Sequence, residues 1–254
     1  MTARAGANGI RMEPKAAIEA EIEGRVARLD WPAIAAALDD RGFALVPALM
    51  RPGECAAVAR MYERRELFRS RVEMARFRFG LGEYKYFAAP LPPIVAAIRA
   101  SLYGRLAPIA TRWSRALRLG ADYPPTLDEF LRACHSGGQS RPTPLLLRYA
   151  AGGFNCMHQD LYGELFFPLQ ATVMLSRPEI DFAGGEFLLA ENRPRAQARV
   201  EAIALARGMA VIFATRWRPI QGARGAYRAA VRHGVSTIAR GRRMTLGIIF
   251  HDAR

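Results

Sequence analysis

The chain has 254 residues, of which 51% are hydrophobic, and its formal net charge at pH 7 is +14. This length suits a single buried core, and no stretch approaches the roughly 20 apolar residues of a membrane-spanning helix, so we expect no membrane partner. The first residues, MTARAGANGIRMEPK, lack the apolar segment of a secretory signal, which predicts a cytoplasmic protein.

Three regions are expected from the change in composition along the chain. Residues 1–28 alternate Ala, Glu and Arg, which predicts a flexible or helical N-terminal arm. The remainder, 29–254, is expected to form one domain, with a helical part over about 29–140 and a strand-rich core over about 141–254.

Helix signals begin at Trp31, where apolar residues recur at helical spacing. Pro32 is typical of a helix start and Gly42 of the position just past a helix end. A short strand is expected over 43–49, and a second helix over 52–68.

A third helix is expected over 93–118, where apolar residues recur on one face: Ile94, Ile98, Leu102, Leu106 and Ile109. Residues 119–144 are rich in Pro, Gly and Ser, so we expect a long surface loop with one helical turn around 127–134. His135 falls in this polar loop, where an ordinary structural role is expected.

After Arg141 the pattern changes to short runs of Val, Ile, Leu, Thr and Phe separated by Gly, Pro or Asn. Helices followed by six to eight strands predict an α+β fold that ends in an antiparallel sandwich or barrel. The three cysteines are far apart and odd in number, which predicts reduced thiols and neither disulfides nor a zinc site: Cys55, Cys134 and Cys156.

A candidate metal site begins with His158 and Asp160. Residues i and i+2 of a strand face the same side, so these two side chains can bind one ion together. A third ligand must come from another strand, and His233 lies in one of the predicted strands. Two His and one carboxylate that leave positions open are the ligand set of non-heme Fe(II) oxygenases.

Ten residues after His233 the next predicted strand contains Arg243 and, two residues later on the same face, Thr245. A guanidinium binds a carboxylate through two parallel hydrogen bonds, and a hydroxyl can add a third. The pair therefore suits the distal carboxylate of 2-oxoglutarate, although Arg243 also lies in an Arg-rich part of the chain.

These five positions resemble the HxD…H…RxT pattern of the Fe(II)/2-oxoglutarate dioxygenases over about residues 144–252. The resemblance implies a double-stranded β-helix (jelly-roll) core with N-terminal helices packed against it. It also implies Fe(II) bound by His158, Asp160 and His233, 2-oxoglutarate bound by Arg243 and Thr245, and O₂ as co-reactant. Zinc- or iron-binding cupin-like proteins are the alternative to this dioxygenase family.

Two local resemblances extend this one. The segment 181–191, DFAGGEFLLAE, resembles the hairpin before the third metal-ligand strand of prolyl-hydroxylase-like members. The segment 148–160, RYAAGGFNCMHQD, resembles the AlkB-type nucleic-acid dealkylases, which implies that Tyr149 contacts 2-oxoglutarate. The chain departs from the AlkB pattern at Ile249, where those enzymes carry a second Arg.

Further candidates lie close to these motifs. His251 is expected at the surface or behind the metal ligands, with a ligand role as the alternative. Aromatic and basic residues alternate over 77–87, which predicts either a stacking platform for bases or an edge strand and loop over the barrel mouth. Four residues are candidates for the substrate entrance: Glu164, Arg148, Asn155 and Arg232.

Three functions are consistent with the sequence. The first, which the charge and the AlkB-like segment favour, is oxidative dealkylation of nucleic acid. The second is a prolyl-hydroxylase-like protein or small-molecule hydroxylase, and the third is a non-catalytic jelly-roll binding protein. The charge alone does not separate them, because 35 of the 37 basic residues are Arg, which a general Arg-rich, Ala-rich composition would also produce.

Overall fold

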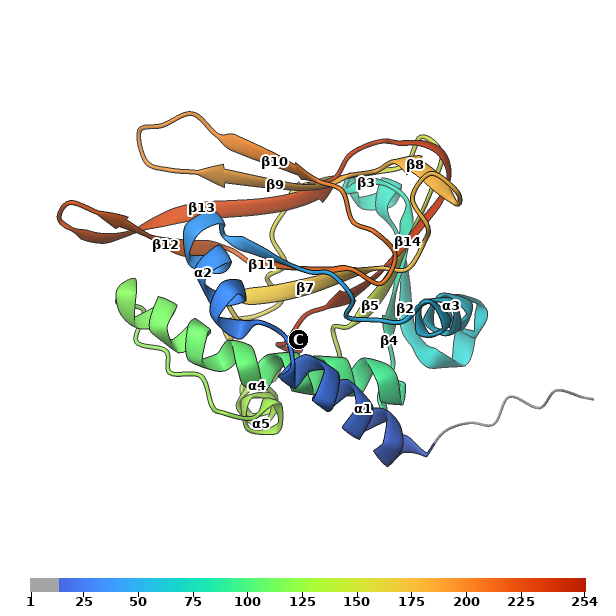
Figure 1. The fold of residues 1–254 in the computed structure, drawn as a ribbon, viewed down its shortest axis with the longest axis horizontal. Coiled ribbons are helices and arrows are strands. Elements are labelled where there is room, and N and C mark those ends of the chain that lie inside the picture. Colours follow the sequence, from blue (N-terminus) through green and yellow to red (C-terminus); the bar gives the residue numbers. More distant parts are fainter. Residues whose placement is uncertain (1–13) are drawn as a thin grey trace, which may run out of the picture.

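The computed structural model describes residues 14–254, and five helices precede most of the sheet (Figure 1). The bounds predicted for the helix at Trp31 are confirmed: Pro32 lies in its first turn, and Gly42 follows its end with a left-handed φ of 78°. Asp30, just before the helix, accepts a hydrogen bond from the Ala33 N–H. The helices are α1 (Lys15–Ala27), α2 (Trp31–Arg41), α3 (Pro52–Arg60), α4 (Pro93–Ala116) and α5 (Leu127–Ser136).

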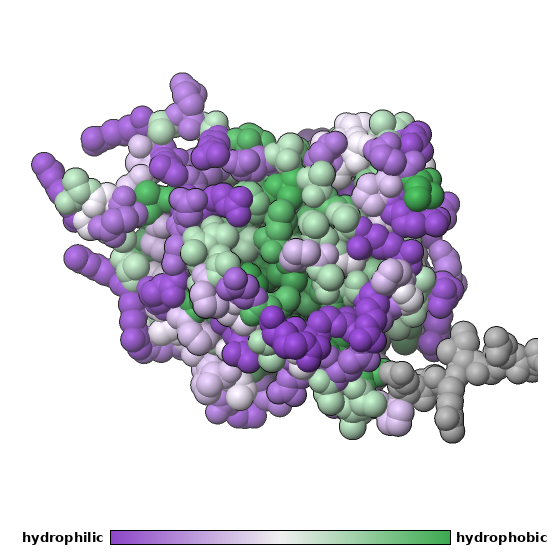
Figure 2. Space-filling model, viewed as in Figure 1, coloured by the Kyte–Doolittle hydropathy of each residue, from purple (hydrophilic) through white to green (hydrophobic). Residues whose placement is uncertain are grey.

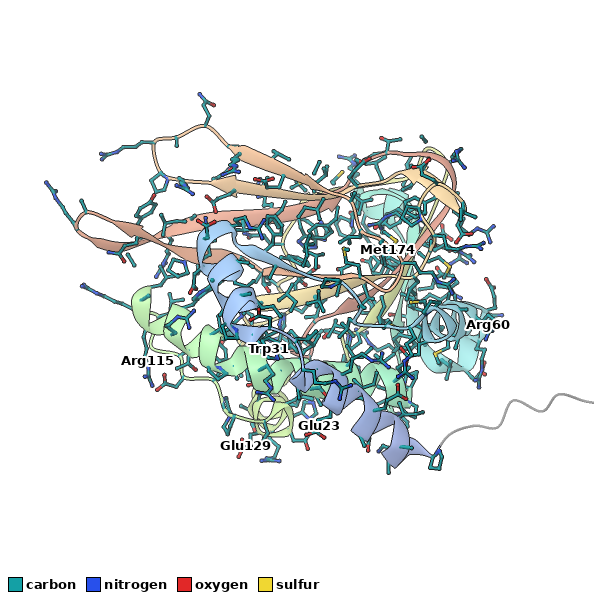
Figure 3. The ribbon with its side chains drawn as sticks, viewed as in Figure 1. Glu23, Trp31, Arg60, Arg115, Glu129 and Met174 are labelled. Atoms are coloured by element: carbon teal, nitrogen blue, oxygen red, sulfur yellow. The ribbon has the colours of Figure 1, made fainter. Side chains whose placement is uncertain are left out.

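The described part of the expected N-terminal arm, residues 14–28, is helical, and one face of this helix is buried. Ile22 and Val26 of α1 are buried, and α1 packs along α4. The indole N–H of Trp31, labelled in Figure 3, donates to the Val26 carbonyl at 2.8 Å and so ties α1 to α2. Residues 1–13 lie outside the described part of the chain.

Two sequence expectations in the helical part were wrong. The helix expected over 52–68 ends at Arg60, and two short 3-10 turns lead to a strand that begins at Phe68. The expected surface loop contains α5, a ten-residue helix whose Phe130 packs on Phe167. A Thr126–Glu129 capping box begins α5, and the buried face formed by Leu127, Phe130 and Cys134 holds it against the core.

The strands form two antiparallel sheets, as a double-stranded β-helix requires. The larger sheet has the order β1-β11-β7-β14-β5-β4-β2, with β8 also paired to β14, and the smaller has the order β10-β9-β13-β6-β3, with β12 also paired to β13. The bounds are β1 (Phe43–Val46), β2 (Phe68–Glu73), β3 (Gly80–Leu81), β4 (Glu83–Phe87), β5 (Leu145–Ala150), β6 (Phe154–His158), β7 (Leu169–Met174), β8 (Phe182–Gly184), β9 (Phe187–Asn192), β10 (Arg199–Ile203), β11 (Ala210–Ala214), β12 (Trp217–Gly222), β13 (Gly225–Val235) and β14 (Ile238–Ile248).

The core lies between the two sheets and under the helices. Helices α1, α4 and α5 gather below the larger sheet, while the tips of the β9–β10 and β12–β13 hairpins project toward the left of Figure 1. Figure 2 shows that these projecting ends are hydrophilic, whereas apolar side chains gather toward the middle of this face. No helix of the described residues is long and apolar enough to cross a bilayer.

The hairpin expected over 181–191 is replaced by a crossing between sheets. Strand β8 pairs with β14 of the larger sheet, whereas β9 pairs with β10 and β13 of the smaller one. Gly184 ends β8 and Gly185 follows it, with φ of 71° and 69°, which only glycine adopts without strain. The paired glycines therefore permit a turn, but its two strands separate.

Candidate functional site

A potential metal-binding cluster lies where β6 and β13 meet. His158 and His233 are direct partners in the register of these strands, and the centroids of their rings are 4.2 Å apart. Asp160 lies two residues past the end of β6, so it reaches the cluster from the following loop and not from the strand. One ligand atom of each residue lies within 4.8 Å of the others, the only such group of three or more among residues 14–254.

Backbone and aromatic neighbours orient the two imidazoles. His158 Nδ1 lies 2.8 Å from the Cys156 carbonyl, which leaves Nε2 toward Asp160. His233 Nε2 lies 3.3 Å from the Asp160 carboxylate, and its ring is stacked on Phe187. Each imidazole thus presents Nε2 to the same carboxylate, as ligands of one ion would.

The protonation states of the cluster follow from its burial and charges. Burial opposes ionisation of Asp160, yet hydrogen bonds with His158 and His233 hold its pKa well below the usual value. Burial lowers the pKa of His158, but Asp160 outweighs it and the net pKa is raised. Burial and the neighbouring His158 lower the pKa of His233. A carboxylate between two imidazoles is a donor set that fits Fe(II).

The cluster opens into a cavity of about 460 Å³ between the sheets. Arg243, Thr245 and Tyr149 line the same cavity, so all six predicted site residues come together there. Arg243 lies directly opposite Tyr149 on strands β14 and β5. Register between neighbouring strands therefore places a guanidinium, a hydroxyl and a phenol at one end of the cavity.

Two side chains of this end are buried without polar partners in the part of the chain described here. None of the three guanidinium nitrogens of Arg243 has a hydrogen-bond partner, and neither has the Tyr149 hydroxyl. Burial lowers the pKa of Arg243 to about 10, so the side chain is still charged at neutral pH. A buried charge without a partner is costly, and the carboxylate of 2-oxoglutarate would satisfy it.

A second group of residues holds the metal ligands in place, and no motif in the sequence indicates it. The Tyr162 hydroxyl donates to Asp160 Oδ1 at 2.7 Å and accepts from the Tyr86 hydroxyl at 2.8 Å. The Gln159 side chain donates to the Val231 carbonyl at 2.7 Å and so ties the loop after β6 to β13.

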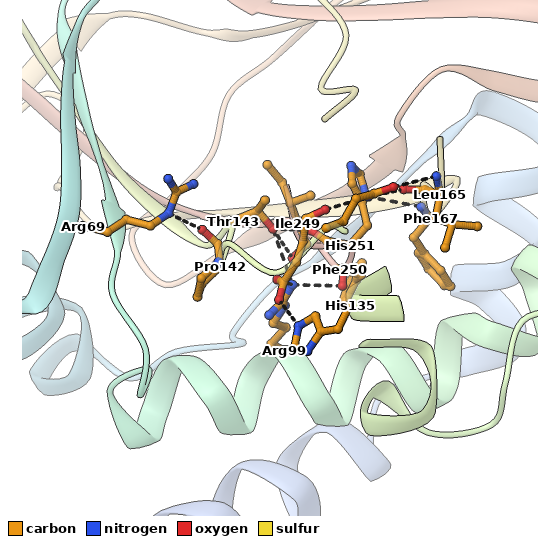
Figure 4. A network of polar contacts seen from close by, with 12 residues as sticks. Arg69, Arg99, His135, Pro142, Thr143, Leu165, Phe167, Ile249, Phe250 and His251 are labelled. Atoms are coloured by element: carbon orange, nitrogen blue, oxygen red, sulfur yellow. Dashed lines mark hydrogen bonds and ion pairs between the residues drawn. The ribbon is translucent and has the colours of Figure 1, made fainter. Parts of the chain in front are cut away.

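His251 is not at the surface, as one expectation had it, and does not belong to the metal cluster. It is buried beside Tyr162, and its Nδ1 accepts a hydrogen bond from the Phe167 N–H at 3.2 Å (Figure 4). Burial lowers its pKa to about 4, so it is neutral at physiological pH. This position fits the expected role behind the metal ligands.

The C-terminal segment that carries His251 is fixed by a buried polar network. Arg99 of α4 donates to the carbonyls of Ile249 and Phe250 and pairs with Asp252 at 2.8 Å (Figure 4). His135, at the end of α5, lies 2.9 Å from the same carboxylate. His135 thus has the structural role expected of it.

The four entrance candidates separate into two groups. Asn155 lines the cavity, whereas Arg148, Glu164 and Arg232 do not. Arg148 pairs with Glu83 and Glu63 across the outer face of the sheet, because its strand β5 directs alternate residues to opposite faces. Glu164 is exposed and pairs with Arg254.

The cavity wall beyond the metal cluster is aromatic and apolar. Tyr86, Leu145 and Ile249 form a small buried cluster with Tyr84 and Tyr162 packed on it. Ile249, the position at which the chain departs from the AlkB pattern, therefore contributes apolar surface. Strand β4, which carries Tyr84 and Tyr86, is internal to the larger sheet and not an edge strand.

The chain matches one protein-family model and two curated relatives. A family model described as "Oxygenase, catalysing oxidative methylation of damaged DNA" matches residues 82–253, which include every residue of the cluster and of the cavity end around Arg243. Two uncharacterised proteins from Mycobacterium tuberculosis strains are each 48% identical over 167 residues, which is 66% of this chain and 72% of theirs.

Solved structures with the same fold include two bacterial oxygenases. An oxidoreductase of the 2OG-Fe(II) oxygenase family from Burkholderia pseudomallei has a TM-score of 0.53 at 17% identity, with 89% of this chain and 94% of that one covered. A Pseudomonas putida prolyl-4-hydroxylase has a TM-score of 0.51 at 15% identity, with 88% and 99% covered. At these identities the likeness establishes the fold alone.

Proposed function

Since the chain belongs to the Oxygenase-NA family within the Fe(II)/2-oxoglutarate oxygenases, we propose that it removes alkyl groups from damaged nucleic-acid bases by oxidation. The observation that carries the proposal is the match of residues 82–253, which include the whole cavity end around Arg243, to a family of oxygenases described as acting on damaged DNA. Oxygen insertion into an N-methyl group can remove that group but supplies none to add, so the proposed direction is demethylation.

His158, Asp160 and His233 hold the iron of this enzyme class. When bound, the metal supplies the activation of O₂, coupled to decarboxylation of 2-oxoglutarate. Overall, an N-methylated base, O₂ and 2-oxoglutarate give the N-hydroxymethyl base, succinate and CO₂. The hydroxymethyl base then loses formaldehyde, and its nitrogen regains a proton.

We assign the cosubstrate end of the cavity to Arg243, Thr245 and Tyr149. The proposal is supported by the unpartnered guanidinium of Arg243 and the unpartnered Tyr149 hydroxyl, which lie on facing strands. A guanidinium fork matches a carboxylate in geometry and in charge. In this role Arg243 would orient 2-oxoglutarate and Tyr149 would add a hydrogen bond.

The other end of the cavity suits a flat ring. Along the same sheet that carries Arg243 and Tyr149, the cavity is lined by the uncharged side chains of Tyr84, Tyr86, Leu145 and Ile249. A base that leaves its stack can be held against such aromatic surface. This end therefore supports a nucleobase as the group that is oxidised.

The test uses the iron-loaded protein, 2-oxoglutarate and single-stranded oligonucleotides that carry one N-methylated base. Formaldehyde release, with loss of 14 Da from the oligonucleotide, is the expected result, and His158→Ala and Asp160→Ala should abolish both. Succinate release with a gain of 16 Da on a peptide or metabolite from a cell extract, and no formaldehyde from any oligonucleotide, would contradict dealkylation and favour a hydroxylase.

A further inference from the structure

The mouth of the cavity carries an exposed pair of phenylalanines, Phe77 and Phe79, which we call the aromatic rim. Phe77 is 57% exposed and Phe79 is 46% exposed, and their rings stack on each other with centroids 5.6 Å apart. Phe79 also lines the cavity. Apolar rings left in water beside a binding cavity are typical of an interaction site.

The aromatic rim is held on a fixed backbone. The Phe79 carbonyl accepts a hydrogen bond from the Cys156 N–H at 2.8 Å, and the Phe79 N–H donates to the Met74 carbonyl at 3.0 Å. Gly80 pairs with Asn155 so closely that a Cβ at Gly80 would collide with the Phe154 carbonyl. The exposed rings are therefore presented by ordered backbone and are not the tip of a loose loop.

Uncompensated positive charge flanks the aromatic rim. Arg76 and Arg78 are exposed, and neither has a carboxylate within ion-pair distance among residues 14–254. Arg78 adopts a left-handed φ of 59°, which is strained for a residue with a side chain, and it lines the cavity beside Phe79. Alternation of aromatic rings and guanidinium groups is the pattern of a surface that binds single-stranded nucleic acid.

We propose that the aromatic rim binds the base adjacent to the oxidised base in a single strand, while Arg76 and Arg78 contact the phosphates on either side. This inference rests on the proposed function and names how its substrate is held. Stacking on Phe79 would keep the neighbouring base outside the cavity, so that only one base enters. A single strand suits this arrangement better than a duplex, because in a duplex the neighbouring base is already stacked and paired.

The binding test measures fluorescence anisotropy of a labelled single strand with one methylated base, with Mn(II) and 2-oxoglutarate present. Phe79→Ala should weaken binding by about 5- to 150-fold, and Phe79→Trp should restore it, because the ring and not its identity provides stacking. Ile180→Ala is the matched control, since Ile180 is 67% exposed but lies away from the cavity. It should bind as the wild type does.

Charge is tested separately with Arg78→Gly, which removes the guanidinium and relieves the left-handed strain. The slope of log affinity against log salt should become shallower by about 0.7, the contribution of one phosphate contact on a single strand. The rise in melting temperature that 2-oxoglutarate gives should be unchanged in all of these variants, because each of them keeps Arg243, Thr245 and Tyr149.

Three outcomes would overturn the inference, and only the third would also overturn the proposed function. Wild-type affinity in Phe79→Ala, together with normal formaldehyde release from oligonucleotides, would refute the role of the aromatic rim alone. Loss of affinity in Phe79→Ala for a peptide but not for a single strand would refute nucleic acid as the occupant. Absence of any oligonucleotide binding or formaldehyde release by the wild type would refute both proposals.

Discussion

Arg243 and Tyr149 face each other across β14 and β5, with the guanidinium carbon 5.7 Å from the phenol ring centroid, and in the described chain neither has a polar partner for its head group. These two buried polar groups on adjacent strands have unsatisfied hydrogen-bond donors. An anion with acceptor atoms would satisfy them, and without such a ligand the unsatisfied donors lower the stability of the folded protein.

Arg243→Met should therefore have opposite effects on stability and on binding. We expect the free energy of unfolding of the apoprotein to rise by about 1–4 kcal/mol, since an unpartnered buried charge is replaced by an apolar side chain. The stabilisation by 2-oxoglutarate, about 2.7 kcal/mol at 100 times the dissociation constant, should disappear. Urea unfolding with and without 2-oxoglutarate measures both.

Arg99→Met is the matched control for Arg243→Met. Arg99 is as deeply buried but pairs with Asp252 and donates to two carbonyls, so its removal takes the guanidinium partner from a buried carboxylate and leaves only His135 beside it. This variant should lose about 3–5 kcal/mol. Equal destabilisation by the two substitutions would show that Arg243 is an ordinary structural arginine.

Tyr162→Phe should weaken metal binding without unfolding the protein. Its hydroxyl donates to the Asp160 carboxylate, and the loss of such a partner behind a ligand typically lowers metal affinity about 10- to 100-fold. Calorimetric titration of the apoprotein with Mn(II) measures this directly. Tyr123→Phe, which removes a hydroxyl that donates to the Phe166 carbonyl, should leave the metal affinity unchanged.

Acid should destabilise the apoprotein in part through His251. Its pKa is about 4 in the folded protein, below the ordinary value of 6.5, so the unfolded chain binds its proton first as the pH falls. The contribution of neutral His251 to the free energy of unfolding is fully present above about pH 6.5. It is lost as the pH falls toward 4, and the loss is roughly 3 kcal/mol. Urea unfolding between pH 7 and 4 should give a smaller loss in His251→Asn. Parallel curves for the two proteins would disprove the assignment.

Gly185→Ala should impair cosubstrate binding through Arg243. A Cβ there would collide with Ile238 and lie 2.9 Å from Arg243 Cδ, in addition to the strain of a φ of 69°. We expect a loss of about 1–2 kcal/mol in stability from the backbone and weaker binding of 2-oxoglutarate. Gly152→Ala has a comparable φ of 81° and open space around its Cβ, so it should lose stability but keep its 2-oxoglutarate affinity.

Local sequence determined the parts of this protein that depend on near neighbours. Strand alternation brings Arg243 and Thr245 to one face, a proline and a glycine bound the helix Trp31–Arg41, and the HxD spacing brings His158 and Asp160 to one ion. In each case the signal and the structure it specifies lie within a few residues of each other.

Tertiary structure alone decided the rest, because those contacts join residues far apart in the chain. Tyr86 reaches Tyr162 across 76 positions, and Arg99 reaches Asp252 across 153, so no local pattern could pair them. The helix at 127–136 is longer than the single turn expected around 127–134, because burial of one face against Phe167 stabilises it, which its flanking Pro and Gly residues do not indicate. Burial likewise lowers the pKa of His251 and leaves Arg243 without a polar partner. Both effects depend on which side chains the folded strands bury, and the sequence near each residue does not show this.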